Sequence, residues 1–211
     1  MKYIVTGGAG FIGSHVVDSL IDDNHDVHVI DNFSTGKKEN CNNRAVYHEL
    51  DLADFSISNN IVEIMHDADG VFHLAALARV QQSIENPVKY ETNNTFGTLN
   101  ILKCASDANV RRLVYSASSS VYGNTETIPC KETDQINPIS PYAIQKYYGE
   151  VQAKMFSEIF NIQTVSLRYF NAYGERQNID GAYATVLGIF AHQKLNNNPM
   201  TIRGDGGQKR D

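Results

Sequence analysis

The residues that decide the fold stand at the start of the chain, in the stretch Lys2-Tyr3-Ile4-Val5-Thr6-Gly7-Gly8-Ala9-Gly10-Phe11-Ile12-Gly13-Ser14. A short apolar run, typical of a buried strand, is followed directly by glycines and then by residues of helical spacing. The glycines fit both G-x-G-x-x-G and G-x-x-G-x-x-G. Glycine allows a tight turn and a close backbone approach, and the start of a helix presents free N–H groups. This stretch therefore predicts a strand, loop and helix that hold the pyrophosphate of a dinucleotide.

The remainder of the first 170 residues alternates short apolar runs with longer segments of helical spacing, the pattern of βαβ units around a parallel sheet. Strands are expected at 2–6, 26–31, 45–50, 70–75, 111–117 and 163–169. Helices are expected to start near Gly10, Ser56, Pro87 and Pro141. From Asn171 onward the rhythm weakens, with a helix expected over 182–196 and a strand near 200–203. The sequence predicts a doubly wound α/β sheet, with one domain over 1–170 and a second beginning at 171–211.

The chain ends on a polar, turn-like run, Gly204-Asp205-Gly206-Gly207-Gln208-Lys209-Arg210-Asp211. Because no helix or strand follows this run, we expect the region 171–211 to be an incomplete substrate-binding region. A fragment, an engineered form and a short natural protein are all compatible with this end.

Composition excludes several classes of protein. The 211 residues are 42% hydrophobic and 20% charged, without an apolar run long enough to span a bilayer or a secretory signal, so a cytoplasmic protein is expected. The net charge is −6 and the basic residues are dispersed apart from Lys37-Lys38 and Arg111-Arg112, which argues against a nucleic-acid partner. Three cysteines without C-x-x-C spacing and seven histidines without a ligand pair predict neither a metal site nor a disulfide framework.

The second expected strand ends in Asp31, eighteen residues beyond Gly13. A carboxylate near this spacing accepts hydrogen bonds from the adenosine ribose hydroxyls of NAD. An NADP site more often carries an arginine beside the acid, whereas the neighbours here are Asn32 and Phe33. NAD is the predicted cofactor, and the pair Lys37-Lys38 leaves NADP as the alternative.

Tyr142 and Lys146 stand four residues apart near the start of an expected helix, so their side chains share one face. A nearby ammonium favours phenolate and is expected to lower the pKa of Tyr142 toward the range useful for proton transfer. The strand 111–117 delivers the serine run 116–120 at its carboxyl end, where α/β sheets bind ligands. The sequence thus places a hydroxyl donor, a phenol and a cation at one site.

With these residues in place, the sequence resembles the extended short-chain dehydrogenase/reductase family, in particular its NAD-dependent sugar-nucleotide epimerases and dehydratases. The resemblance runs from end to end and is carried by Thr6 to Ser14, Asp31-Asn32, Asp51-Leu52, His73-Leu74-Ala75-Ala76, Asn86-Pro87, Asn94, Gly97-Thr98-Leu99-Asn100, Ser116 to Gly123, Tyr142-x-x-x-Lys146, Arg168-Tyr169-Phe170-Asn171, Gly204-Asp205-Gly206 and Arg210-Asp211. It implies a Rossmann fold, and a homodimer formed through the helices near 87–106 and 141–160.

The resemblance also implies a role for each matching residue. The cofactor-binding residues would be Gly7, Gly10, Phe11, Ile12, Gly13, Asp31, Asn32, Asp51, Leu52, Leu74, Ala75, Ala76, Asn94, Ser116, Tyr142, Lys146 and Tyr169. The catalytic residues would be Ser118, Tyr142 as acid and base, and Lys146. The nucleotide-sugar substrate, most simply a UDP-sugar, would contact Arg79, Ser118, Tyr142, Asn171 and Arg210.

The family includes several reactions, of which C4 epimerisation of a UDP-hexose through a 4-keto sugar fits best. Related dehydratases carry an acidic pair after the catalytic serine or threonine, where this sequence has Ser119 and Ser120, and related decarboxylases carry a glutamate near the same place. Both remain alternatives, as does a non-catalytic NAD-binding module. The sequence does not select the sugar, although Arg79 could meet the carboxylate of a uronate.

Overall fold

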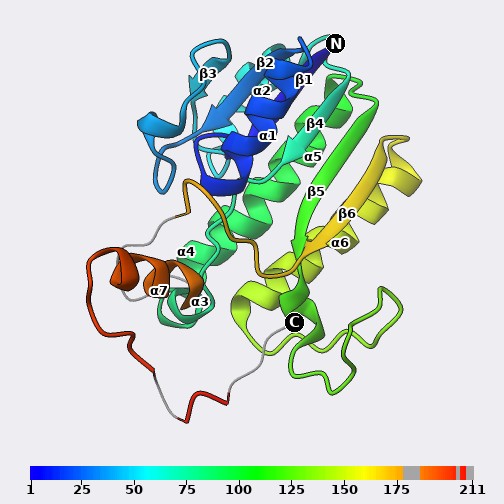
Figure 1. Ribbon diagram of the computed structural model, residues 1–211. Helices are drawn as coiled ribbons and strands as arrows, with labels where there is room; N and C mark the ends of the chain where they lie inside the picture. The colour runs from blue at the N-terminus through cyan, green and yellow to red at the C-terminus, as the bar shows by residue number, and fades with distance from the viewer. Residues whose placement is uncertain (178–185, 203–204, 208–211) are drawn as a thin grey trace.

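The computed structural model describes residues 1–177, 186–202 and 205–207. In this part of the chain six strands form one parallel sheet in the order β3-β2-β1-β4-β5-β6 (Figure 1). The strands are β1 (Lys2–Thr6), β2 (Asp26–Asp31), β3 (Val46–Glu49), β4 (Gly70–His73), β5 (Arg112–Ser118) and β6 (Gln163–Tyr169). The strand order reverses between β1 and β4, which is the point where doubly wound sheets bind their ligands. The predicted α/β Rossmann fold is confirmed.

Helices follow β1, β3, β4, β5 and β6 in the described residues, whereas β2 and β3 are joined by a loop with a single 3₁₀ turn. The helices are α1 (Phe11–Asp22), α2 (Ser58–Met65), α3 (Val80–Glu85), α4 (Pro87–Glu91), α5 (Gly97–Asp107), α6 (Pro141–Ile159) and α7 (Val186–Leu195). A π-helical turn over Thr92–Phe96 joins α4 to α5, so that the two run as one continuous helix. Short 3₁₀ turns occupy Lys38–Asn40, Phe55–Ile57 and Ser119–Tyr122. Turns of this π type often occur at functional sites.

Helices lie on both faces of the sheet, while Val165 and Leu167 of the edge strand β6 remain exposed. Helix α1 lies on one face, where Val17 packs with Val5 and Val29 of the first two strands. Helices α2, α5 and α6 lie on the other face, where Ile4 and Leu113 belong to a second core cluster. Adjacent residues of β1 thus point to opposite cores, because side chains alternate along a strand. This double burial explains why the strands read as continuous apolar runs rather than as alternating ones.

The two helices nearest the expected site begin differently. Helix α6 has an N-cap, Ser140, whose Oγ accepts a hydrogen bond from the Ala143 N–H at 3.2 Å, and Pro141 follows at the first helical position. Helix α1 starts after Gly10, which is extended and supplies no side-chain cap. The first N–H groups of α1 therefore remain available to an anion.

The expected strand near 200–203 is wrong for residues 200–202, and position 203 lies outside the described residues. The Thr201 N–H donates to Gln193 Oε1 at 3.1 Å, and Gln193 Nε2 donates to Thr201 Oγ1 at 2.9 Å. The Thr201 N–H is therefore hydrogen-bonded by the Gln193 side chain of α7 and not by a neighbouring strand. The helix expected over 182–196 is observed over Val186–Leu195, and 182–185 lie outside the described residues.

His73 ends β4 in the centre of the sheet and is only 2% exposed. Its Nδ1 lies 2.7 Å from Thr6 Oγ1 and its Nε2 lies 3.0 Å from Thr98 Oγ1, while its ring stacks against Tyr115. Burial lowers the pKa of His73 to about 3, and the positive charge of Lys146 contributes in the same direction. The folded chain therefore holds this imidazole neutral.

We expect the free energy of unfolding to decrease as the pH falls below 6.5, the ordinary histidine pKa. The unfolded chain takes up a proton on His73 there, whereas the folded chain excludes it until the pH approaches the lowered value. Each proton that only the unfolded chain binds lowers the free energy of unfolding by about 1.4 kcal/mol per pH unit. Urea unfolding at about pH 7.5, 6 and 5 measures how the free energy of unfolding depends on pH. The substitution His73→Asn should lower this pH dependence by the contribution of one proton. A slope unchanged in His73→Asn would contradict the assignment.

Candidate active site

A cavity of about 1420 Å³ opens where the strands end, next to the reversal of strand order. Nineteen of the predicted site residues line it, namely Gly7, Gly10, Phe11, Ile12, Gly13, Asp31, Asn32, Asp51, Leu52, Leu74, Ala75, Ala76, Arg79, Ser116, Ser118, Tyr142, Lys146, Tyr169 and Asn171. These residues come from segments far apart in the sequence, which the parallel sheet brings to one edge. The structure thus places the predicted cofactor and catalytic residues around a single space.

Two predicted site residues do not line this cavity. Asn94 is buried behind the wall, where its Oδ1 accepts from the Leu77 N–H at 2.8 Å and its Nδ2 donates to Leu77 O at 3.0 Å and to Gln145 Oε1 at 3.1 Å. Its predicted part in cofactor binding is therefore indirect, because it fixes the segment after β4 to α6. The other residue, Arg210, lies outside the described residues.

The glycine loop after β1 is packed too closely for side chains. Gly7 has a φ of +70°, and a Cβ there would lie 2.7 Å from the backbone nitrogen of Ala75. A Cβ at Gly13 would collide with the Gly7 carbonyl oxygen. Backbone atoms of three segments are thus in direct contact, namely the end of β4, the glycine loop and the first turn of α1. This cradle fits the pyrophosphate of NAD, because uncapped N–H groups of α1 border the same cavity.

The Asp31 carboxylate is fixed at the end of β2 and is 7% exposed. Its Oδ2 accepts from the Ala9 N–H at 3.0 Å, and its Oδ1 accepts from the Phe33 N–H at 2.8 Å. Each carboxylate oxygen can accept more than one hydrogen bond, so both can still receive ribose hydroxyls. The acid is therefore oriented by the glycine loop in the manner that an adenosine ribose requires.

The two lysines that left NADP as an alternative both have partners in the protein. Lys37 Nζ lies 3.2 Å from Glu39 Oε1, and Lys38 Nζ lies 5.9 Å from the ring centroid of Phe33. Neither contact points to a dedicated site for a 2′-phosphate. The residues around Asp31 therefore fit NAD.

The predicted catalytic residues meet where β5 and α6 face each other. Ser118, at the end of β5, lies close to Tyr142, in the first turn of α6, and both residues border the cavity. One turn further along α6, Lys146 Nζ donates to Ser116 O at 2.9 Å and lies 5.1 Å from the ring centroid of Tyr115. The i, i+4 spacing thus brings the phenol and the ammonium to one face, as predicted.

The pKa of Tyr142 differs from the expectation. Burial raises it, the hydrogen bond with Ser118 lowers it part of the way, and the negative charge that Tyr90 can acquire adds to the increase. The prediction that Lys146 lowers the pKa of Tyr142 is wrong for this structure. The effect of burial dominates, and the Lys146 ammonium is directed at the Ser116 carbonyl and the Tyr115 ring. Burial also lowers the pKa of Lys146 to about 8.

An ion pair next to these residues was not singled out from the sequence. Arg168 of β6 binds Glu150 of α6 through two contacts, Nε to Oε1 at 2.9 Å and Nη2 to Oε2 at 2.8 Å, and its Nη1 donates to Tyr122 Oη at 2.8 Å. The side chains are only 19% and 11% exposed. The hydrogen bonds with Glu150 raise the pKa of Arg168, so the guanidinium stays charged. Glu150 follows Lys146 by four residues, so the sequence already placed it on the same face of the helix as Tyr142 and Lys146. This spacing was the signal in the sequence that could have identified Glu150.

We expect Glu150→Gln to destabilise the protein, because the amide offers Arg168 one acceptor where the carboxylate offers two. A hydrogen bond to a charged group contributes about 1.5–3 kcal/mol, and the free energy of unfolding should fall by this amount. Urea denaturation measures it. Glu158→Gln provides the matched control, since Glu158 pairs with Lys154 at 3.7 Å on the exposed part of the same helix. Equal losses in the two variants would refute a special role for the Arg168 pair.

Two structural features are absent from the part of the chain that the structure describes. None of its helices combines the length and the apolar character that crossing a bilayer requires. Its histidines, cysteines and acidic residues form no group of three or more that could hold a metal ion. The absence of a nucleic-acid partner and the cytoplasmic location stay predictions of the sequence.

The sequence of residues 3–211 matches the family described as "NAD dependent epimerase/dehydratase family". The chain belongs to this family. The resemblance noted from the motifs is thereby confirmed, and NAD is the cofactor of the family as its description states.

Solved structures of similar proteins agree with the family. A UDP-glucose 4-epimerase from Thermotoga maritima, solved with UDP-glucose, is 39% identical with a TM-score of 0.95 over 100% of this chain and 68% of its own. A UDP-N-acetylglucosamine 4-epimerase from Methanobrevibacter ruminantium, in complex with UDP-N-acetylmuramic acid, is 42% identical with a TM-score of 0.93 over 100% and 67%. A UDP-glucose 4-epimerase from Thermus thermophilus, in complex with NAD, is 37% identical with a TM-score of 0.87 over 94% and 64%. This chain spans about two thirds of the length of these relatives.

Proposed function

We propose that this chain is an NAD-dependent 4-epimerase of a UDP-hexose. The observation that carries the proposal is the grouping of Ser118, Tyr142 and Lys146 in one cavity, which the glycine loop and Asp31 also border. The family match and the similarity to 4-epimerases that bind UDP-sugars support the same reaction. A pure binding module would have no need of this catalytic constellation.

In the proposed reaction Tyr142 Oη takes the proton of the sugar 4-hydroxyl, while the Ser118 hydroxyl hydrogen-bonds the same oxygen. NAD, when bound, would supply the hydride acceptor and donor for C4 of the sugar, and its oxidised ring would bring a positive charge into the cavity. That charge favours the phenolate form of Tyr142, whose pKa burial raises. The 4-keto sugar then turns over in the cavity, and Tyr142 returns the proton to the oxygen.

The neighbouring serines distinguish epimerisation from elimination of water. Ser119 and Ser120 line the cavity directly after Ser118, at the positions where the dehydratases of the family carry an acidic pair. Hydroxyl groups cannot supply a carboxylate base there at neutral pH. We also propose a contact of Arg79 with the carboxylate of a uronate sugar, supported by the place of Arg79 in the cavity wall.

We expect Tyr142→Phe to slow 4-epimer formation from UDP-glucose or UDP-N-acetylglucosamine by at least about 100-fold, because the proton loses its acceptor. Proton NMR of the mixture with NAD measures the rate, and gel filtration followed by absorbance shows whether NAD is retained, as it should be. Tyr147→Phe, a partly exposed tyrosine of the same helix, is the control. Formation of a 4-keto-6-deoxy sugar by the unaltered chain would indicate a dehydratase, and NAD binding without conversion would indicate a binding module.

We also propose that the chain forms a homodimer through the outer faces of α4, α5 and α6. Ile144, Tyr148 and Val151 are exposed at i, i+4 and i+7 on α6, opposite the stripe that holds the catalytic residues. Val88 and Phe96 are exposed on the neighbouring continuous helix. A clustered apolar surface of this kind favours burial against a partner, and a second copy offers the same apolar surface.

The double substitution Ile144→Glu with Val151→Glu should shift a dimer toward monomer, because each interface would bury four unpaired carboxylates. We expect the dimer dissociation constant to rise at least about 100-fold, which sedimentation equilibrium measures. Ser157→Glu adds a carboxylate to an exposed polar site of the same helix and should leave the constant unchanged. Monomeric behaviour of the unaltered chain would refute the dimer.

A further inference from the structure

The segment 170–177, which we call the crossing segment, leaves the end of β6 and runs to the start of α1 (Figure 1). Phe170, Asn171, Arg176 and Gln177 of this segment line the cavity. The crossing segment thus forms a wall shared by the phosphate-binding helix and the predicted substrate residue Asn171.

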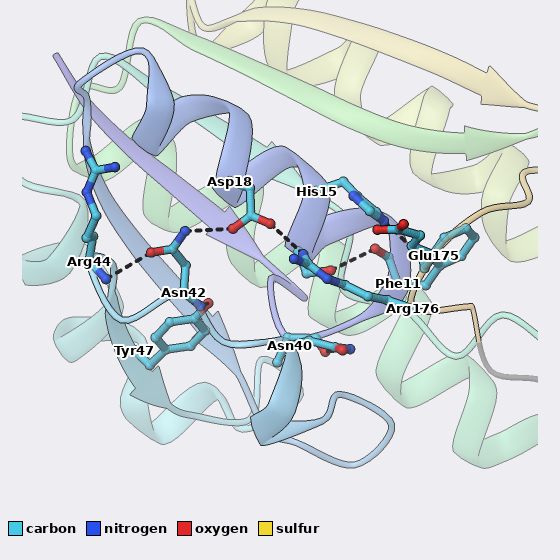
Figure 2. Close-up of polar contacts among 11 residues, drawn as sticks. Phe11, His15, Asp18, Asn40, Asn42, Arg44, Tyr47, Glu175 and Arg176 are labelled. Carbon is cyan, nitrogen blue, oxygen red and sulfur yellow. Dashed lines mark hydrogen bonds and ion pairs between the residues drawn. The ribbon is translucent and has the colours of Figure 1, made fainter.

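Three residues of α1 hold the crossing segment, at i, i+4 and i+7. Gly174 lies beside the ring of Phe11, since a Cβ at Gly174 would be 3.9 Å from the ring edge. His15 Nε2 lies 3.0 Å from the carbonyl oxygen of Glu175. Asp18 Oδ2 lies 2.6 Å from Arg176 Nη1. Figure 2 shows these side chains on the same side of α1, facing the crossing segment.

Asp18 has a second partner, in the loop that follows β2. Its Oδ1 accepts from Asn42 Nδ2 at 2.7 Å, and the Asn42 backbone N–H donates to Tyr47 Oη at 3.0 Å (Figure 2). In the same loop Asn40 Nδ2 donates to the carbonyl oxygen of Ala9 in the glycine loop at 3.0 Å. A single carboxylate therefore joins α1, the loop after β2 and the crossing segment.

The ion pair with Asp18 restrains the position of Arg176. Arg176 has a φ of +63°, a left-handed conformation that is unfavourable for arginine and needs support from its surroundings. The two side chains are 32% and 29% exposed, so that the pair is partly shielded from water. Burial raises the pKa of Asp18, but the hydrogen bonds from Asn42 and Arg176 outweigh it and lower the pKa, which keeps the carboxylate charged at neutral pH.

We propose that Asp18 is a positioning residue for NAD, which holds Arg176 and thereby the crossing segment across α1 and so slows the release of the dinucleotide. Asp18 itself is absent from the cavity lining, whereas Arg176 is part of it, so any effect of Asp18 on NAD must pass through its partners. The proposal rests on the NAD binding of the family and is independent of which sugar is converted.

The test is the dissociation rate of NAD from the full chain, without sugar, measured by dilution into a trap of excess competing ADP-ribose. We expect Asp18→Asn and Arg176→Gln each to release NAD about fivefold faster, which corresponds to ~1 kcal/mol. The double variant should be no faster than either single one, because both remove one interaction. Arg176→Lys, which keeps the charge, should restore most of the retention. Asp107→Asn, at the exposed pair with Lys103 on α5, is the matched control and should have no effect.

A second measurement separates positioning from general stability. Amide hydrogen exchange of 174–177 in NAD-free protein should become faster in Asp18→Asn, while exchange in β1 and β4 stays unchanged. Unchanged release in Asp18→Asn, or slower release because Arg176 is freed to bind phosphate, would overturn the proposal. Faster exchange throughout the sheet would also overturn it, since the effect would then be loss of stability. Failure to convert any sugar would refute the proposed function and leave these NAD measurements valid.

Discussion

The structure depends on a steric constraint at the end of β1, where three pieces of backbone meet without side chains between them. Gly7 approaches the backbone of Ala75 after β4, and Gly13 approaches the carbonyl oxygen of Gly7. This contact sets the distance of α1 from the sheet and leaves its first N–H groups uncapped at the cavity. It also lies where the strand order reverses, so the ends of β1 and β4 open a space between the helices that cover opposite faces. The remaining site residues are arranged around that space.

Burial governs the chemistry of the site more than pairwise charge does. Lys146 and His73 lie in one buried layer, and the neutral imidazole is the form that tolerates the nearby ammonium. The Ser116 carbonyl and the Tyr115 ring compensate Lys146 for part of its lost hydration. Burial likewise raises the pKa of Tyr142, which favours its protonated form. The bidentate pair of Arg168 and Glu150 then fixes α6 relative to β6.

Sequence reasoning predicted the parts of the molecule that depend on local pattern. Strands 2–6, 26–31 and 163–169 match the structure because apolar runs between turn residues are read directly from the chain. The glycine loop and Asp31 were found because their spacing is tied to a known ligand geometry. The ion pair of Arg168 with Glu150, the effect of burial on Tyr142 and the pairing of Thr201 with Gln193 were missed. Each depends on which side chains and backbone groups meet in the folded chain, and no periodicity in one sequence carries that information.

The order of the strands has a consequence for how the chain can assemble while it is being synthesised. β2 pairs with β1 and β3 pairs with β2, while β4 takes the free edge of β1, β5 that of β4 and β6 that of β5. Each new strand thus adds to an edge that earlier residues have already made, and none has to insert between two paired strands. The strands can therefore join the sheet in the order in which they are synthesised. β2 and β3 add on one side of β1, and β4, β5 and β6 then add on the other.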